Sequence, residues 1–300
     1  MTDFRIHAAS LGGTALPGCS GYAAEVGRSV STFATSGSAH RRLIAAGRYA
    51  KAVSITTSGL FTALSKLGTP ATVPVPCASL AGHIGGLVLA ASAQDAILPA
   101  DTAGAAELMT VTNGLIALRG ISWSQPGEAC VCDVGVWPLS TDGQADAWAL
   151  SQGAIPALPA SEEDYDLHAA TWKGVALDGM TGLQLAIATN PQVEFNPGSI
   201  YPTMIRQAPA TGPIEVSASF TLPDRAALRA YGQHFHGGAV GALVLTFRRF
   251  SNAAARDAAN PVVITLTGAA EVSQAQDGRP GSVSVTVHGV KTDGTSPLAW

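Results

Sequence analysis

Valine alternates with small polar residues along SVSVTVHGV, at residues 282–290. This two-residue period is typical of a strand with one buried and one exposed face. ALVLTF (242–247) and PVVITLTGAAEV (261–272) are rich in β-branched and apolar residues, which also favours strands. GLVLAA (86–91) and MTVTNGLIALRG (109–120) show the same character in the first half of the chain. The pattern predicts a mainly β protein.

Turn and helix signals lie between these stretches. QPGE (125–128) and DGRPGS (277–282) have the residues of hairpin turns. LFTALSKLG (60–68) ends in glycine, two residues after a lysine. LPDRAALRAYG (222–232) has Pro-Asp directly after its first residue and also ends in glycine. Glycine commonly ends a helix, so we expect one short helix in each half of the chain.

The chain carries one phrase twice. RIHAASLGGTALPG at 5–18 matches DLHAATWKGVALDG at 166–179, and the ungapped alignment that places His7 on His168 gives eleven identities over the forty positions from 7 to 46. Chance would give about a tenth of the positions in a chain this rich in Ala and Gly. The identities include His7 with His168, Gly13 with Gly174, and Gly18 with Gly179.

Further blocks match in the same order. AVSITTSGLFTALSKLG (52–68) corresponds to PIEVSASFTLPDRAALRAYG (213–232), and GGLVL (85–89) to GALVL (241–245). Residues 111–136 correspond to 265–290 and pair Gly127 with Gly281, while STDG (140–143) matches KTDG (291–294). Collinear blocks of this kind indicate an internal duplication.

The duplication predicts two tandem antiparallel β-sandwich or barrel domains, each with one short α-helix. We place them at residues 1–145 and 162–300, with a linker at 146–161 that contains two prolines. The alternative for the linker is a helix or arm packed on one domain, because Trp148 and Leu150 would need cover. Each unit of about 140 residues is long enough to bury a core.

Composition limits the partners of this chain. Charged residues make up only 13% of it, and its net charge is −4. Low charge fits a β-rich protein whose surface is largely covered by further copies of itself. Arg41-Arg42 and Arg248-Arg249 are isolated pairs, and neither resembles the basic patch of a nucleic-acid reader. The acidic run from Glu162 to Asp166 is expected to be solvated.

The four cysteines suggest structural thiols. Cys19, Cys77, Cys130 and Cys132 form no CxxC pair, and two residues along a strand are too far apart for an easy disulfide. The start MTDFRIHAAS lacks the features of a signal peptide, and no apolar run reaches the ~18 residues of a membrane span. We therefore expect assembly in a cytoplasm.

No constellation for catalysis, cofactor binding or metal binding stands out. His234 and His236 have the spacing of two ligands on one strand face, but no Cys, Asp or Glu with ligand spacing accompanies them. We interpret His7 and His168 as hydrogen-bonded structural residues. Gly18-Cys19-Ser20-Gly21 lacks the spacing of a nucleophile elbow, and GGTALPG lacks that of a phosphate loop.

Each copy resembles the tail tube (major tail) proteins of long-tailed bacteriophages. The resemblance lies in the order of features: the small-residue turn in LGGTALPG and WKGVALDG, the loop ending in Gly-Ser in SGSAHRRLI and PGSIYPTMI, a strand running into a short helix, and two long strands around a Pro-Gly turn. It covers most of both copies.

This resemblance implies a structural virion protein without catalysis or cofactor. Copies would join side by side into rings, and rings would stack into a hollow tube through which genomic DNA passes without sequence-specific binding. Members that carry the fold twice form homotrimers with pseudo-six-fold symmetry, and a closed ring covers open sheet edges. Other tail proteins would be further partners, with no membrane insertion.

Two other classes of function remain open. One is a different assembly or adhesion protein, such as a capsid decoration, baseplate or receptor-binding protein. The other is an enzyme or ligand-binding protein with a site between the copies that uses His7, His168 or the pair His234 and His236. The repeat positions that carry the architectural interpretation are His7, Gly13, Gly18, Gly127, His168, Gly174, Gly179 and Gly281.

Overall fold

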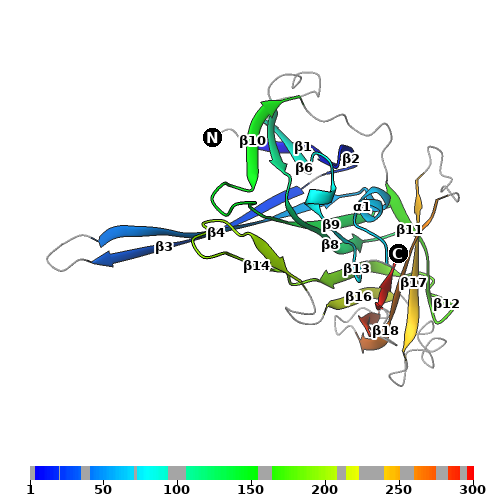
Figure 1. The fold of residues 1–300 in the computed structure, drawn as a ribbon. Helices are drawn as coiled ribbons and strands as arrows, with labels where there is room; N and C mark the ends of the chain where they lie inside the picture. Colours follow the sequence, from blue (N-terminus) through cyan, green and yellow to red (C-terminus); the bar gives the residue numbers. More distant parts are fainter. Residues whose placement is uncertain are drawn as a thin grey trace.

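The computed structural model shows a mainly β molecule, as the sequence predicted (Figure 1). It describes residues 4–19, 21–34, 41–70, 73–93, 106–154, 164–207, 214–222, 240–250, 260–274, 283–290 and 296–300. Within these ranges the elements form a five-stranded sheet, a 13-stranded sheet and a two-stranded ribbon. The five-stranded sheet packs above the middle of the 13-stranded sheet in Figure 1.

The five-stranded sheet has the order β10-β7-β6-β1-β2. Its strands are β1 (Phe4–Leu11), β2 (Thr14–Leu16), β6 (Leu87–Ala93), β7 (Ala106–Val111) and β10 (Trp148–Gly153). Residues of β1, β6 and β7 are buried in the core that this sheet shares with the larger one.

The 13-stranded sheet follows the path β12-β11-β17-β18-β19-β16-β13-β8-β9-β4-β3, with β20 on β18 and β5 on β8. From the first half of the chain it takes β3 (Gly21–Ala34), β4 (Arg41–Thr57), β5 (Cys77–Ser79), β8 (Gly114–Trp123) and β9 (Val131–Pro138). From the second half it takes β11 (Tyr165–Trp172), β12 (Val175–Ala176), β13 (Thr181–Ala188), β16 (Glu215–Leu222), β17 (Gly241–Arg249), β18 (Val262–Gln274), β19 (Val283–Gly289) and β20 (Leu298–Ala299).

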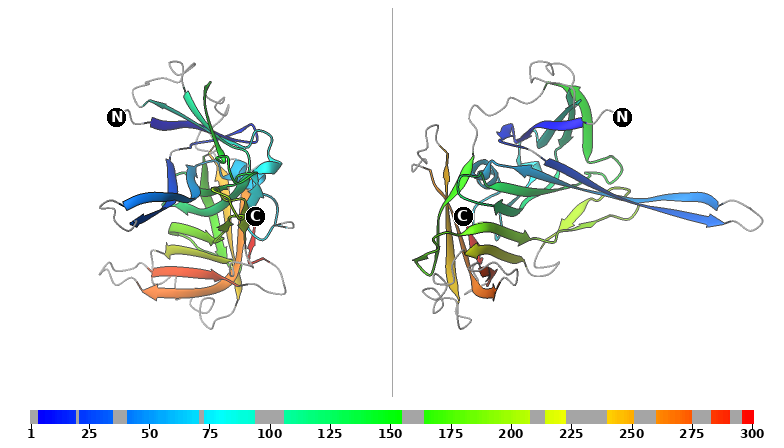
Figure 2. Two further views of the ribbon diagram at one scale, coloured as in Figure 1. Left: turned by 60° about the vertical axis from the view of Figure 1, so that its left-hand side comes forward. Right: turned by 180° about the vertical axis from the view of Figure 1, so that it is seen from behind.

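Two ribbons extend from this body. Strands β3 and β4 form a long hairpin that projects away from the rest of the molecule (Figures 1 and 2). Strands β14 (Gln192–Glu194) and β15 (Met204–Arg206) form the short two-stranded ribbon of the second half. The short ribbon is anchored on the first half, because Ile200 N and Tyr201 N both donate to Gly143 O.

The helix expected at 60–68 is confirmed as α1 (Leu60–Lys66). Leu60, Ala63 and Leu64 are buried, and Gly68 has a φ of +91°, a left-handed value at the glycine that follows the helix. A 3₁₀ turn follows at Leu80–Gly82. The second expected helix, 222–232, lies outside the described residues apart from Leu222, which ends β16. Among the helices of the described ranges, none is long and apolar enough to cross a membrane.

The first strands of the two halves have the same pairing. In β1 and β6, Phe4 lies opposite Ala93 and Leu11 opposite Leu87, with a break in register between Ile6 and Ala8. In β11 and β17, Tyr165 lies opposite Arg249 and Trp172 opposite Leu243, with a break between Leu167 and Ala169. All of these positions correspond in the alignment of the two copies, so each half contains a β-bulge at the repeated histidine.

The turns that follow these strands also correspond. Gly12 and Gly13 have φ values of +58° and +73°, and Lys173 and Gly174 have +49° and +80°. Two consecutive left-handed residues make the turn that suits the twist of a hairpin. Gly12 N donates to Gly86 O at 2.8 Å, and Lys173 N donates to Ala242 O at 3.0 Å, again at matching positions of the two copies.

Each half also turns a corner at a glycine. Strand β18 pairs with β17 up to Gly268 and with β19 from Gly268 onward, so its partner strand changes at this glycine. In the first half the same path is split into β7, which pairs with β6, and β8, which pairs with β9 and begins at Gly114. The predicted single stretch 109–120 is therefore interrupted at positions 112 and 113.

The expected linker contains a strand. Trp148–Gly153 forms β10, which extends the edge of the five-stranded sheet by pairing with β7. Trp148 packs partly against the core, whereas Leu150 is 73% exposed. This part of 146–161 is an arm on the first half, the alternative that the need to cover Trp148 had raised.

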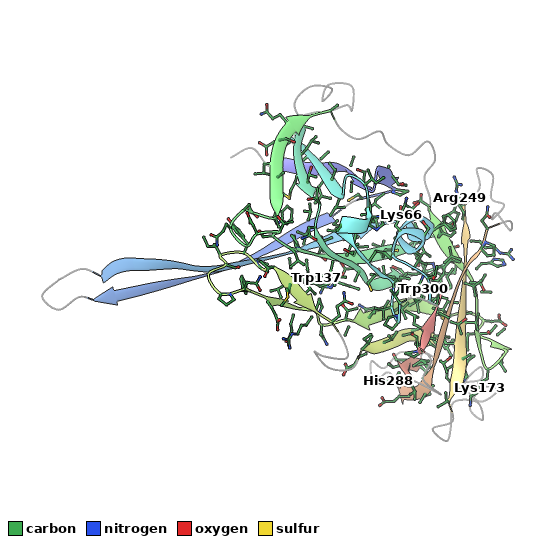
Figure 3. All side chains as sticks on the ribbon, in the orientation of Figure 1. Lys66, Trp137, Lys173, Arg249, His288 and Trp300 are labelled. Atoms are coloured by element: carbon green, nitrogen blue, oxygen red, sulfur yellow. The ribbon has the colours of Figure 1, made fainter. Side chains whose placement is uncertain are left out.

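One hydrophobic core runs through both halves. It joins Ile55 and Val134 of the first half to Leu185, Phe220 and Leu245 of the second. The C-terminal segment adds to this union, because Trp300 Nε1 donates to Gly68 O at 3.2 Å beside α1 (Figure 3). The halves therefore share a sheet and a core instead of standing apart as separate bodies.

Candidate functional site

The feature that distinguishes this chain is the junction between its halves. Strand β13 of the second half pairs antiparallel with β8 of the first, so that Leu183 lies opposite Trp123 and Ala186 opposite Gly120. On its other edge β13 pairs with β16. The second half thereby continues the sheet of the first by antiparallel strand pairing.

Straight rows of side chains cross this junction. One row runs from Val131 through Ser122, Gln184, Ser219 and Thr286 to Glu271, each directly opposite the next. Directly opposed residues of an antiparallel pair project to the same face of the sheet. The row therefore defines one continuous face across β9, β8, β13, β16, β19 and β18.

This face carries many small hydroxyl side chains, and we call it the hydroxyl face. The opposite side chains on the same strands, such as Ile121, Leu185 and Phe220, are buried in the core. The hydroxyl residues of the face are partly or largely exposed: Ser54, Thr56, Ser122, Ser217, Ser219, Thr221, Ser284 and Thr286.

Charges are few on the hydroxyl face, and several are paired. Arg119 Nε lies 3.7 Å from Asp133 Oδ2, and Ser54 Oγ donates to Asp133 Oδ1 at 2.6 Å. At the other end of the sheet, His288 Nε2 lies 3.3 Å from Glu271 Oε2 (Figure 3). Exposed pairs of this kind contribute little to stability, but they reduce the net field over the face.

The hydroxyl face is hollowed at the junction. A recess of about 620 Å³ lies where β4, β9, β8 and β13 are adjacent, and Thr56, Ser122, Asp133, Gln184 and Ala186 are among its lining residues. Asp133, the carboxylate among these residues, accepts the hydrogen bond from Ser54 Oγ and lies beside Arg119.

A buried carboxylate ties the halves together beneath the junction. Asp166 is 0% exposed, accepts a hydrogen bond from Trp123 Nε1 at 2.7 Å, and accepts another from the backbone N–H of Gly127 at 3.2 Å. The expectation that the whole acidic run is solvated was therefore wrong at Asp166. Its carboxylate holds the Pro-Gly turn of the other half in place, which the local sequence does not reveal.

The repeated histidines do not come together in a site. His7 and His168 lie on β1 and β11, which belong to different sheets, and each is the residue at the break in strand register. A bulge leaves its extra residue out of the ladder, so the repeated position has an architectural reason. The side chain of His168 is exposed.

The repeated glycines occupy turns. Gly13, Gly18, Gly127, Gly174 and Gly179 all have positive φ values, between +57° and +92°. Gly281 lies outside the described residues. STDG also forms a turn, because Asp142 Oδ1 accepts from Gln144 N and Ala145 N at 2.8 Å each. These contacts, with the Ser140 hydroxyl, lower the pKa of the Asp142 carboxyl.

The remaining candidates of the sequence are distributed as follows. His234 and His236 lie outside the described residues, and within the described ranges no three His, Cys, Asp or Glu side chains are grouped to hold a metal ion. All four cysteines are unpaired, and Cys77, Cys130 and Cys132 are buried. The contact with Cys130 and burial raise the pKa of the Cys132 thiol.

The geometry is thus a sheet that continues from one half to the other, with many hydroxyl side chains on its exposed face. Comparison of the chain with protein-family models gives no match, and comparison with curated proteins gives none either.

Proposed function

We propose that this chain is a structural subunit of a bacteriophage tail tube. Three chains form a ring with pseudo-six-fold symmetry, and the rings stack into a hollow tube in the virion. It acts without catalysis and without a cofactor. The observation that carries this proposal is the junction of β13 with β8, by which one half continues the sheet of the other. The same kind of strand pairing that joins the two similar halves can be repeated between neighbouring chains until a ring closes.

The hydroxyl face supports the same proposal. In a closed ring the sheet would present this face to the lumen, because the opposite face is occupied by the core. DNA carries one negative charge per ~1.7 Å and is held by clusters of Lys and Arg. A face rich in Ser, Thr and Gln, on which Arg119 lies beside Asp133, would let the duplex pass without arrest.

Electron microscopy of the purified full chain tests the assembly. We expect rings with a central hole, and stacks of rings at higher protein concentration. A protein that stays monomeric over a broad range of concentration and salt would contradict the proposal. Rings that never stack would favour a terminal or baseplate ring over a tube.

A pair of variants tests the lumen. Gln184→Lys with Ser219→Lys adds two cations to the hydroxyl face, where these residues lie directly opposite each other. The matched control, Gln144→Lys with Gln152→Lys, adds the same charge at exposed positions away from that face. We expect assembled rings of the first variant alone to retain duplex DNA at low salt. Equal retention by the control would contradict the assignment of the lumen.

A further inference from the structure

The internal junction gives a template for contact between chains. Strand β13 uses one edge to pair with its own half, at β16, and the other to pair with β8. The contact is antiparallel, with Leu185 opposite Ile121 and Ala186 opposite Gly120. It is heterologous, because the two strands are not equivalent positions of the two halves.

Both strands of the junction have a counterpart in the other half. Strand β3 corresponds to β13 in the alignment that places Gly21 on Gly182, and it pairs with β4 as β13 pairs with β16. The second part of β18, from Gly268 to Gln274, corresponds to β8, since each begins at the corner glycine and pairs with the next strand of its half, β19 or β9.

These counterparts are open edges among the described strands of the sheet. Strand β3 is the last strand of the path, and Ala269–Gln274 pairs on one side only, with β19, among the described strands. The run β19-β16-β13-β8-β9-β4 separates the two edges, so they lie on opposite sides of this run of strands. Open edges of this length invite pairing with another chain.

The faces of the two edges match when the template is applied. Ala24 lies opposite Val53, a core residue, and Glu25 lies opposite Ala52, which lines the recess in the hydroxyl face. In β18, Gln274 lies opposite the buried Val283, and Ser273 lies opposite Ser284 of the hydroxyl face.

Position 119 is a bulge in β8, so Gly120 and Ile121 correspond to Ser273 and Gln274. The template then sets Ala24 opposite Gln274 and Glu25 opposite Ser273. A slip by a single position would turn the core side of one edge to solvent.

An apolar side chain marks the β18 edge. Val272 is 37% exposed, whereas its counterpart in β8, Leu118, is 1% exposed. Leu118 N donates to Pro76 O at 2.9 Å, so that part of the β8 edge already has cover.

We propose that β3 of one chain pairs antiparallel with Ala269–Gln274 of a second copy of this chain, in the register that places Glu25 opposite Ser273. The inference rests on the proposed ring assembly and names the contact that closes it. Junctions within a chain and between chains then alternate around the ring, and every sheet edge that the junction uses is occupied.

Disulfide trapping tests the register. We expect Glu25→Cys with Ser273→Cys to form interchain disulfides in assembled rings, because directly opposed residues bring their Cα atoms within about 4.5–5.5 Å. The products on a non-reducing gel would be dimers and closed trimers. Gln184→Cys with Ser122→Cys is the positive control, since this pair is directly opposed inside one chain.

A matched control separates the predicted edge from its neighbour. Glu25→Cys with Ser284→Cys moves one thiol to β19, at the same level and on the same face. We expect at least about tenfold less interchain disulfide from this control, because one strand spacing takes the pair out of disulfide reach. Equal yields from the two pairs would overturn the register.

A charge exchange covers the case in which the cysteine variant does not assemble. Ser273→Glu alone would set two carboxylates opposite each other and reduce ring formation, and Glu25→Lys added to it would restore the rings. Wild-type rings with neither the disulfide nor the rescue would overturn this inference and leave the tube proposal standing. A wild-type chain that forms no ring would overturn both.

Discussion

Gly114 and Gly268 occupy corresponding positions of the two halves, where the chain changes its partner strand. A Cβ at Gly114 would overlap the carbonyl oxygen of Trp137, and one at Gly268 would overlap that of His288. Gly114 also has a φ of +141°. Backbone atoms cannot move aside as a flexible side chain can, so close approach of two strands explains why both positions hold glycine.

We expect Gly114→Ala and Gly268→Ala each to lower the free energy of unfolding by about 2–3 kcal/mol. Gly82→Ala is the control, because a Cβ at Gly82 meets nothing within 4 Å and its φ is not positive. Urea unfolding of the three variants checks this. If Gly114→Ala and Gly268→Ala lower the free energy of unfolding no more than Gly82→Ala does, the close backbone approach does not explain the glycines at these positions.

Asp166 and Trp123 form a polar contact inside the shared core. Asp166→Ala would leave the indole N–H of Trp123 buried without its acceptor, so we expect a loss of about 2–3 kcal/mol in unfolding free energy. Asp166→Asn keeps an acceptor oxygen and should cost less. In the Trp123→Phe background the cost of Asp166→Ala should fall. If Asp166→Ala lowers the unfolding free energy equally in both backgrounds, the side chains of Asp166 and Trp123 are not energetically coupled.

Burial raises the pKa of the Cys19 thiol from 9.0 to about 11. At pH 8 the native thiolate fraction should then be about 100-fold below that of an unperturbed cysteine. The native state holds its proton where the unfolded state has lost it, so this contribution to stability falls as the pH rises from 9 toward 11. The pH profile of alkylation at Cys19, read by peptide mass spectrometry, checks the midpoint. A midpoint near 9 would contradict it.

At the scale of elements, the alternation of apolar and polar residues and the glycines at helix ends predicted several of the strands and the helix. The stretches 242–247, 261–272 and 282–290 lie largely in β17, β18 and β19, and the stretch 60–68 contains α1. The short strands β5, β14 and β20 escaped prediction, because such short segments carry no readable period. Strand β10 also escaped, since most of its side chains are exposed and its pairing with β7 depends on the partner.

Strand β20 shows how a short element can matter. It has only two residues, yet Leu298 is 2% exposed and pairs with Leu266 of β18. We expect Leu298→Ala to cost about 2–4 kcal/mol, because it removes a buried side chain and leaves a cavity. Val263→Ala, on the exposed side of β18, should cost under about 1 kcal/mol. Thermal unfolding compares them, and similar losses would mean that β20 does not anchor the core.

At the scale of the molecule, the duplication pattern predicted two units but not their union. Alternation indicates which side chains are buried, and it does not indicate which strand lies alongside which. The junction of β13 with β8 and the contact of Asp166 with Gly127 both join residues remote in sequence. The candidate site therefore depends on contacts between the halves, which no local pattern of residues indicates.

A shared core should make the chain unfold as a unit. We expect one cooperative transition in denaturant, coincident by fluorescence and circular dichroism, because β13, β8 and one core link the halves. The isolated segments 1–145 and 162–300 should each lack a cooperative transition. Two resolved transitions in the full chain, or a stably folded segment, would contradict this.

The long hairpin has a consequence for stoichiometry. Strands β3 and β4 contain 14 and 17 residues, whereas the ribbon strands β14 and β15 of the second half contain 3 each. In the proposed ring the long projection would occur once per chain, at every second position around the circumference. Fusing two units in one gene allows such alternation, because each half can acquire its own appendage. A ring of identical single units would carry the same projection at all positions.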